Sequence, residues 1–174
     1  MSVRRREHRD RGAAAVEFAL VVPVLLLLVF GIIDFGLFFS DSLSARQGVR
    51  EAARQGAVEN WSATSCSGRP GSGDANLRRI ACLGIDRTGA VAGDVYARVE
   101  TTRAWTEGDD VTVCVVVREN GVTGFTPLPG DGVLRSAVTM RIETDTTRPR
   151  PNGPAMASDS GLSPSSPPGG WGWC

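Results

Sequence analysis

The chain has 174 residues, of which 41% are apolar, and its 19 acidic residues balance 19 basic ones. A neutral chain gives no global indication of nucleic-acid binding. Every basic residue is an arginine and the only histidine is His8, which excludes P-loop phosphate binding, Schiff-base chemistry and hydrolases that need an imidazole inside the fold. We therefore expect no enzyme activity, no cofactor, no metal site and no small-molecule substrate.

The strongest feature is an apolar stretch near the N-terminus. Residues 18–33 carry no charge, and apolar residues continue after Asp34. As a helix, residues 13–39 would extend about 40 Å, whereas the hydrocarbon core of a bilayer is about 30 Å thick. The Arg-rich segment before it predicts, by the positive-inside rule, a cytoplasmic N-terminus. We expect a single-pass cell-membrane protein whose remaining residues lie outside.

A secretory signal peptide is the alternative interpretation of this stretch, with small residues such as Ser42 and Ser44 near the cleavage site. The apolar stretch is longer than the usual apolar region of about 7 to 15 residues. Glu17 also lies in its first turns, where a charge disfavours insertion. We therefore favour a membrane helix over a cleaved signal peptide.

Residues 40–58 predict that the same helix continues as a stalk, because they are rich in alanine and arginine and contain no proline. A ridge of small side chains recurs every four residues along this helix. Such a ridge allows close helix crossing; the alternative is a chance product of an Ala- and Gly-rich composition. The small-residue ridge consists of Gly36, Ser40, Ser44, Gly48, Ala52 and Gly56.

A short helix is predicted after the stalk. Residues 60–73 are rich in glycine and serine and are expected to form a loop. Asp74 can then cap a helix over residues 75–83, and Gly84 is placed to end it. This helix has one apolar face, which includes Leu77.

Three later segments alternate apolar and polar residues with the period of a half-buried strand. They cover residues 94–103, 110–119 and 134–144, and the second places Val113 and Val115 on one face. Turn residues between them predict an antiparallel sheet with one buried face. The short helix and the outer half of the long helix are the elements available to cover that face.

The residues from Thr146 onward hold six of the ten prolines, and we expect them to be disordered because they cannot bury a core. The predicted fold class is α+β. A long N-terminal transmembrane helix continues as an extracytoplasmic stalk, followed by a short helix, a three-stranded antiparallel sheet and the disordered tail. The expected parts are a basic leader (1–12), membrane helix (13–39), stalk (40–58), head (59–145) and tail (146–174).

The junction between leader and membrane helix carries a motif in which Gly12 is followed by four small or apolar residues, then Glu17 and Phe18. This pattern is typical of type IV prepilin-like leaders. Together with the apolar run that follows, VREAARQGA in the stalk and SAVTMRIE in the last strand, the sequence resembles the TadE-like family, the minor pseudopilins of tight-adherence (Flp) pilus systems. The resemblance covers residues 11–57 and returns over residues 111–143.

The resemblance implies both a function and partners. In this family the head is extracytoplasmic and acts in assembling or exporting pilus fibres, and prepilin peptidase would cut between Gly12 and Ala13. We therefore expect a membrane-anchored minor pseudopilin that contacts membrane lipid, prepilin peptidase and other pilus or pseudopilin subunits, but no nucleic acid. The alternative is an uncleaved single-pass membrane protein with an extracytoplasmic binding or adhesion domain.

Two acidic residues bracket the apolar core of the helix. Glu17 disfavours insertion by on the order of 1 to 3 kcal/mol. By resemblance to pilin assembly, its partner is the new amine of Ala13, on the same chain or on a neighbouring subunit; snorkelling to the headgroups is the alternative. Asp34 stands where the family tends to have an acid before Phe-Gly, and here we favour snorkelling over a pairing role.

The four cysteines permit three complete pairings. We predict a disulfide between Cys66 and Cys82, because they flank a Gly-rich loop in a compartment expected to be oxidising. Closing this loop of about fifteen residues would stabilise the head by ~3 kcal/mol in the chain-entropy model. A bridge between Cys82 and Cys114 is the next choice, and Cys174 is expected to be free.

A group of acidic residues in the head is the remaining candidate for a chemical site. These residues fall at strand edges and in a turn, where solvated charge is the expected role. They are Glu100, Glu107, Asp109, Asp110 and Glu119.

Overall fold

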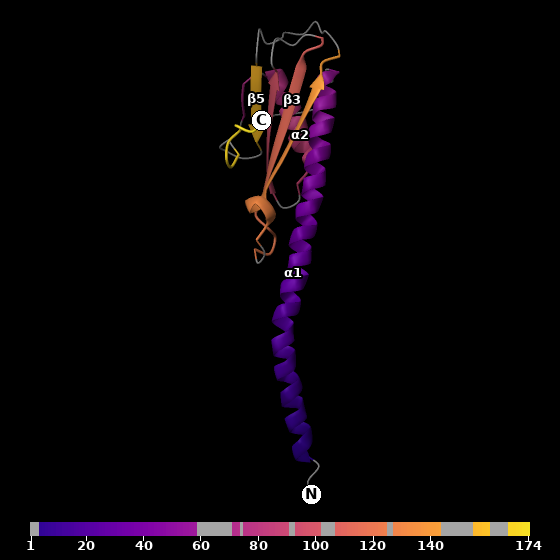
Figure 1. The fold of residues 1–174 in the computed structure, drawn as a ribbon, viewed down its shortest axis with the longest axis vertical. Helices are drawn as coiled ribbons and strands as arrows, with labels where there is room; N and C mark the ends of the chain where they lie inside the picture. Colours follow the sequence, from indigo (N-terminus) through magenta and orange to yellow (C-terminus); the bar gives the residue numbers. More distant parts are fainter. Residues whose placement is uncertain are drawn as a thin grey trace.

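The computed structural model describes residues 4–58, 71–73, 75–90, 93–101, 107–124, 127–143, 155–160 and 167–174. One long helix, α1, runs the length of the molecule, and a small head packs beside its outer half (Figure 1). The head contains a second helix, α2, and an antiparallel sheet. The predicted α+β class, with its long apolar helix, short helix and three alternating strands, is confirmed.

Helix α1 spans Arg4–Ala57, and its 54 residues correspond to about 80 Å of helix. The predicted helix is therefore present from the apolar stretch through the stalk, and it also begins earlier, within the basic leader. Pro23 lies inside it without ending it. Since a proline in an apolar membrane helix loses only one backbone hydrogen bond, which neighbouring groups can replace, such a helix tolerates it.

Helix α2 spans Ala75–Thr88 and continues through Gly84, where we expected it to end. The reason is packing. A Cβ built at Gly84 would lie 3.6 Å from the Cβ of Ala52 and 3.5 Å from a methyl of Val115, which are ordinary van der Waals distances, so α2 is packed against both α1 and the sheet at this position. The helix ends instead before Gly89, whose φ of +50° is readily adopted by glycine.

The sheet has five strands in the order β1-β5-β2-β3-β4, and every described pair is antiparallel. The three predicted strands are present as β2, β3 and β4. A turn of 3-10 helix, η2, precedes β4. The bounds are β1 Gly71–Gly73, β2 Gly93–Thr101, β3 Asp110–Glu119, η2 Pro129–Gly132, β4 Val133–Arg141 and β5 Ala155–Ser160.

The main core lies between the sheet and the two helices, as predicted. The alternating apolar residues of β2 and β3 face this core, and β4 adds partly buried apolar side chains to it. From the helices, Val49 and Ala52 of α1 and Leu77 and Ile80 of α2 are buried there. The outer half of α1 is thus a structural part of the head.

Two strands come from segments where none was predicted. β1 falls in the expected Gly-rich loop, and β5 falls in the tail expected to be disordered, which also contributes residues 167–174 to the described structure. The expectation of disorder is therefore wrong for these parts of the tail. β5 pairs with β2 through its backbone, and residues such as Ala157 and Ser158 give no apolar alternation from which a strand could be predicted.

Candidate functional site

From Val16 to Ile33, α1 exposes an apolar surface in which Glu17 is the one charged residue. Its large side chains lie outside the head, with Leu20 71% and Ile32 74% exposed. The helix is long and apolar enough to cross a bilayer, and none of its most apolar 18-residue window is buried. Because covering so many apolar side chains with lipid is strongly favourable, this part of α1 fits a single-pass membrane anchor.

The predicted processing residues lie at the start of this surface. Gly12, Ala13, Glu17 and Phe18 are all exposed on α1, and a Cβ at Gly12 would meet no other atom within 4 Å. The head does not approach these residues, since it packs on the opposite end of the helix (Figure 1). The peptide bond after Gly12 is therefore sterically open, although its helical backbone would have to unwind locally in a protease.

The small-residue ridge divides into two parts. Towards the head, a Cβ at Gly48 would lie 2.5 Å from Oγ1 of Thr88, and one at Gly56 would lie 3.1 Å from Cδ1 of Ile80. Ala52, between them, is fully buried. Towards the membrane, the ridge opens: Gly36 and Ser40 are exposed, and Ser44 is partly buried. The part of the ridge over residues 48–56 therefore packs against α2 of the same chain.

Asp34 is bound by the head, so our expectation that it snorkels to the membrane interface is wrong. It is 2% exposed. Its Oδ1 accepts hydrogen bonds from the backbone N–H groups of Val122, at 3.1 Å, and Thr123, at 3.0 Å, and its Oδ2 accepts one from the Thr123 hydroxyl. The loop between β3 and β4 thus clasps α1 at this carboxylate.

A second acid on α1, Asp41, is fully buried against Glu119 of β3, which is 5% exposed. Our expectation that Glu119 is solvated is therefore wrong. Burial, together with the hydrogen bond and charge of Asp41, raises the pKa of Glu119 to about 8. With this raised pKa, Glu119 is mostly protonated at neutral pH and can donate a hydrogen bond to Asp41. Gly93 and Gly132 pack closely against Glu119, since a Cβ at either position would clash with it.

Stability should fall as pH rises through the folded-state pKa of Glu119. The folded pKa of about 8 lies above the ordinary value of 4.5, so this stability is fully present below pH 4.5 and is lost progressively as the pH rises through about 8. We expect the Tm of the head to fall by roughly 5 °C or more between pH 6 and 9. Glu119→Gln, which keeps a neutral donor, should flatten this dependence in thermal unfolding followed by circular dichroism. Exposed Glu107→Gln is the control; an equal slope in both variants would contradict the assignment.

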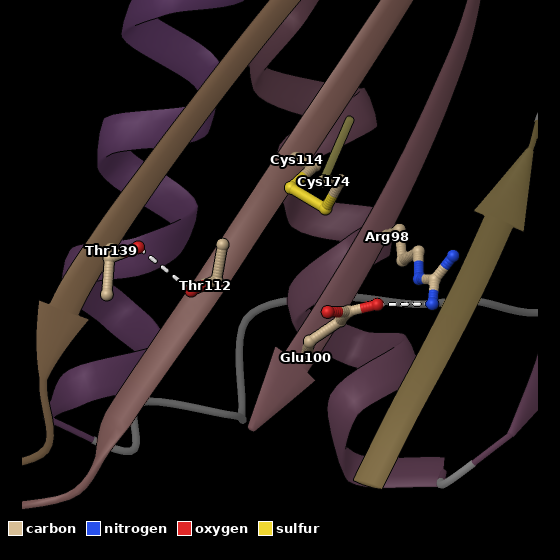
Figure 2. The surroundings of a disulfide bond; sticks show 6 residues. All are labelled: Arg98, Glu100, Thr112, Cys114, Thr139 and Cys174. Carbon is tan, nitrogen blue, oxygen red and sulfur yellow. Dashed lines mark hydrogen bonds and ion pairs between the residues drawn. A yellow bond between two sulfur atoms is a disulfide. The ribbon is translucent and has the colours of Figure 1, made fainter. Parts of the chain in front are cut away.

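The outer face of the sheet is held by a disulfide between Cys114 of β3 and Cys174, with Cα atoms 6.2 Å apart (Figure 2). Cys174 is thus not free, and the alternative bridge between Cys82 and Cys114 is wrong. Cys82 is buried on α2 and is disulfide-bonded. Cys66, the partner we predict for it, lies outside the described residues, so that pairing stays a prediction.

Two tryptophans beside Cys174 contact arginines of the sheet. The Arg98 guanidinium lies 5.9 Å from the Trp171 ring centroid, and that of Arg135 lies 5.9 Å from the Trp173 ring. Such cation-π contacts contribute about 0.5 to 1 kcal/mol each at exposed sites. Arg98 also pairs with Glu100 on the same strand (Figure 2). The terminal WGWC segment therefore covers an otherwise polar sheet face.

The remaining acidic residues of the head do not gather into a chemical site. Glu107 and Asp110 are exposed and Asp109 is partly exposed. Among the described residues, no group of three or more His, Cys, Asp or Glu side chains is arranged to hold a metal ion. The described residues instead form an exposed apolar helix, a loop hydrogen-bonded to that helix at Asp34, and a head held by a disulfide.

One comparison with known proteins bears on this arrangement. Residues 12–54 match the family described as TadE-like protein, which confirms the resemblance over this segment, whereas the resemblance over residues 111–143 stays a prediction. The matched segment contains the exposed apolar surface, the clasp residue Asp34 and most of the part of α1 that packs in the head. No curated protein and no solved structure matches the chain significantly.

Proposed function

The chain carries a TadE-like domain over residues 12–54, and from this premise we propose that it is a membrane-anchored minor pseudopilin that acts through protein-protein contacts in the assembly or export of Flp-type pili. The single observation that carries the proposal is the construction of α1: one helix presents an uncovered apolar surface at one end and the core of the head at the other. The function is structural, without catalysis.

The proposed topology puts the N-terminus in the cytoplasm and the head outside. The leader is rich in arginine, which the positive-inside rule retains on the cytoplasmic side. The disulfide between Cys114 and Cys174 supports an extracytoplasmic head, because such bonds form and persist in oxidising compartments. Its partners would be membrane lipid, other pilus or pseudopilin subunits and, before assembly, prepilin peptidase.

We expect prepilin peptidase to cut between Gly12 and Ala13, because the basic leader meets the apolar helix there and Glu17 follows at the motif's spacing. The mature chain would begin AAAVEF. N-terminal sequencing and intact mass of the membrane-purified protein, from a host with an active prepilin peptidase, test this directly. A Gly12→Leu variant is the control and should keep its leader.

An intact mass that retains residues 2–12 in that host would contradict processing. It would favour instead the uncleaved single-pass protein with an extracytoplasmic binding or adhesion domain. The two functions are thus separated by one measurement on the full chain.

A further inference from the structure

The clasp at Asp34 lies at a definite depth along α1. The segment from Gly12 to Ile33 has 22 residues, of which Glu17 alone is charged; as helix it corresponds to about 33 Å, close to the ~30 Å of a bilayer's hydrocarbon core. If this segment spans the bilayer, Asp34 falls at its outer boundary. Apolar side chains continue one turn further, with Phe39 62% exposed, so lipid contact extends past the carboxylate.

The β3–β4 loop, residues 120–124 and 127–128, is brought to the same depth because two of its N–H groups and one hydroxyl bind Asp34. This connection and η2 form the end of the head nearest the inner half of α1 (Figure 1). No described residue of the loop carries a charge. Among the described residues outside α1, Val122 is the most exposed large apolar side chain, at 61% against 40% for Val58.

We infer that the β3–β4 loop is a second membrane contact, with Val122 inserted at the boundary between the lipid headgroups and acyl chains beside α1. This rests on the proposed function only in requiring that α1 spans a bilayer. The ligand is the lipid surface, because the loop continues the apolar face of the membrane helix rather than forming a separate patch.

The hydrogen bonds between Asp34 and the loop reduce the free-energy cost of placing these polar groups at the membrane boundary. A carboxylate or a free N–H moved out of water costs several kcal/mol when it has no partner. Here Asp34 and the N–H groups of Val122 and Thr123 satisfy each other. The loop therefore supplies the Val122 side chain, which faces lipid, and the N–H groups that hydrogen-bond to Asp34. These hydrogen bonds offset the desolvation of the carboxylate at the membrane boundary. Two contacts, α1 and the loop, would fix the tilt and rotation of the head on the membrane.

Spin labelling tests the inference on the full chain in phosphatidylethanolamine and phosphatidylglycerol vesicles. Labels are placed at Val122→Cys, at Leu26→Cys within the apolar surface, and at Glu107→Cys in the β2–β3 turn near the far end of the head. Cys114 and Cys174 are disulfide-bonded and do not compete for the label. Collision rates with oxygen, which concentrates in lipid, and with a water-soluble nickel chelate report the depth of each position.

Leu26→Cys serves as the lipid reference and Glu107→Cys as the water reference. We expect the oxygen-to-nickel collision ratio at Val122→Cys to lie closer to the lipid reference than the ratio at Glu107→Cys does. If Val122→Cys gives the same ratio as Glu107→Cys while Leu26→Cys gives a lipid value, the loop does not contact the membrane. The membrane anchor would still stand in that case. A water value at 26 itself overturns both the anchor and the loop contact. Low collision rates with both agents at 122 mark a protein contact in place of lipid and overturn the inference.

A second pair of variants tests the clasp in the Val122→Cys background. Asp34→Ala removes the acceptor and should shift the ratio at 122 towards the value at 107, whereas Asp34→Asn keeps an acceptor oxygen and should retain most of the lipid value. An unchanged ratio in Asp34→Ala overturns the role of Asp34 in placing the loop.

Discussion

Glu17→Val is expected to give normal or improved membrane insertion and normal cleavage after Gly12, but to abolish assembled fibres and co-purification with other pilus subunits. Insertion should improve, because a carboxylate in the first turns of a membrane helix costs on the order of 1 to 3 kcal/mol. Glu17 is exposed on α1, so it is accessible to a neighbouring subunit. Paired with the amine of Ala13, on the same chain or a neighbour, it would fix axial register more than it would add stability.

The controls separate charge from bulk. Glu17→Asp keeps the charge and should retain a measurable fraction of the fibres, whereas Glu17→Gln keeps hydrogen bonding without charge and should resemble Glu17→Val. Val21→Leu, one turn further along the exposed surface, should assemble normally. Fibre counts by electron microscopy and pull-down of partner subunits are the measurements. Wild-type fibre levels in Glu17→Val would show that Glu17 is only an interfacial acid.

Gly48→Ala should destabilise the head strongly, although the substitution is normally favourable inside a helix. The new Cβ would lie 2.5 Å from Oγ1 of Thr88, 2.8 Å from its backbone N and 3.0 Å from the carbonyl oxygen of Gly84. Two of these are backbone atoms of α2, and the Thr88 hydroxyl donates a 2.7 Å hydrogen bond to Gly84 O, so α2 must shift as a body. Overpacking of this kind costs about 1 to 3 kcal/mol.

Gly36→Ala is the matched control, from the same ridge on the same helix. A Cβ there meets nothing within 4 Å, so its expected effect on the head is none or slightly stabilising. Thermal unfolding in detergent, followed by near-UV circular dichroism, should show Tm lowered by roughly 5 to 15 °C in Gly48→Ala alone. Equal Tm values for the two variants would mean that α1 and α2 do not pack as closely as described.

The parts of the fold with a strong apolar pattern were predictable from the sequence. The uncharged run over residues 18–33 predicted the exposed helix. The alternation in β3, where Val113 and Val115 are buried against the helices, predicted the sheet and its covered face. β5 was not predictable, because backbone pairing with β2 forms it and its small residues carry no period. The end of α2 was missed because packing against Ala52 outweighs the weak helix propensity of Gly84.

The polar contacts of the candidate site depended on tertiary structure. Asp34 and Val122 are 88 positions apart in the chain, and nothing local to either marks the hydrogen bond between them. The turn composition around Gly121 predicted a loop, but not its partner. Similarly, Glu119 was expected to be a solvated acid, and its raised pKa follows only from the approach of α1, which buries it beside Asp41.

The attachment of the head along α1 has a mechanical consequence. The head is tied to the helix at Asp34 and again where the Glu143 N–H donates to the carbonyl oxygen of Ala57, about 35 Å further along the axis. Between these ties, β3 and β4 run lengthwise beside the helix (Figure 1). Tension between a fibre and an embedded helix would load this seam in shear, so its contacts would have to break together rather than peel apart one by one. With α1 embedded in a membrane, a pull on the helix would thus be carried to the head along the whole length of this seam.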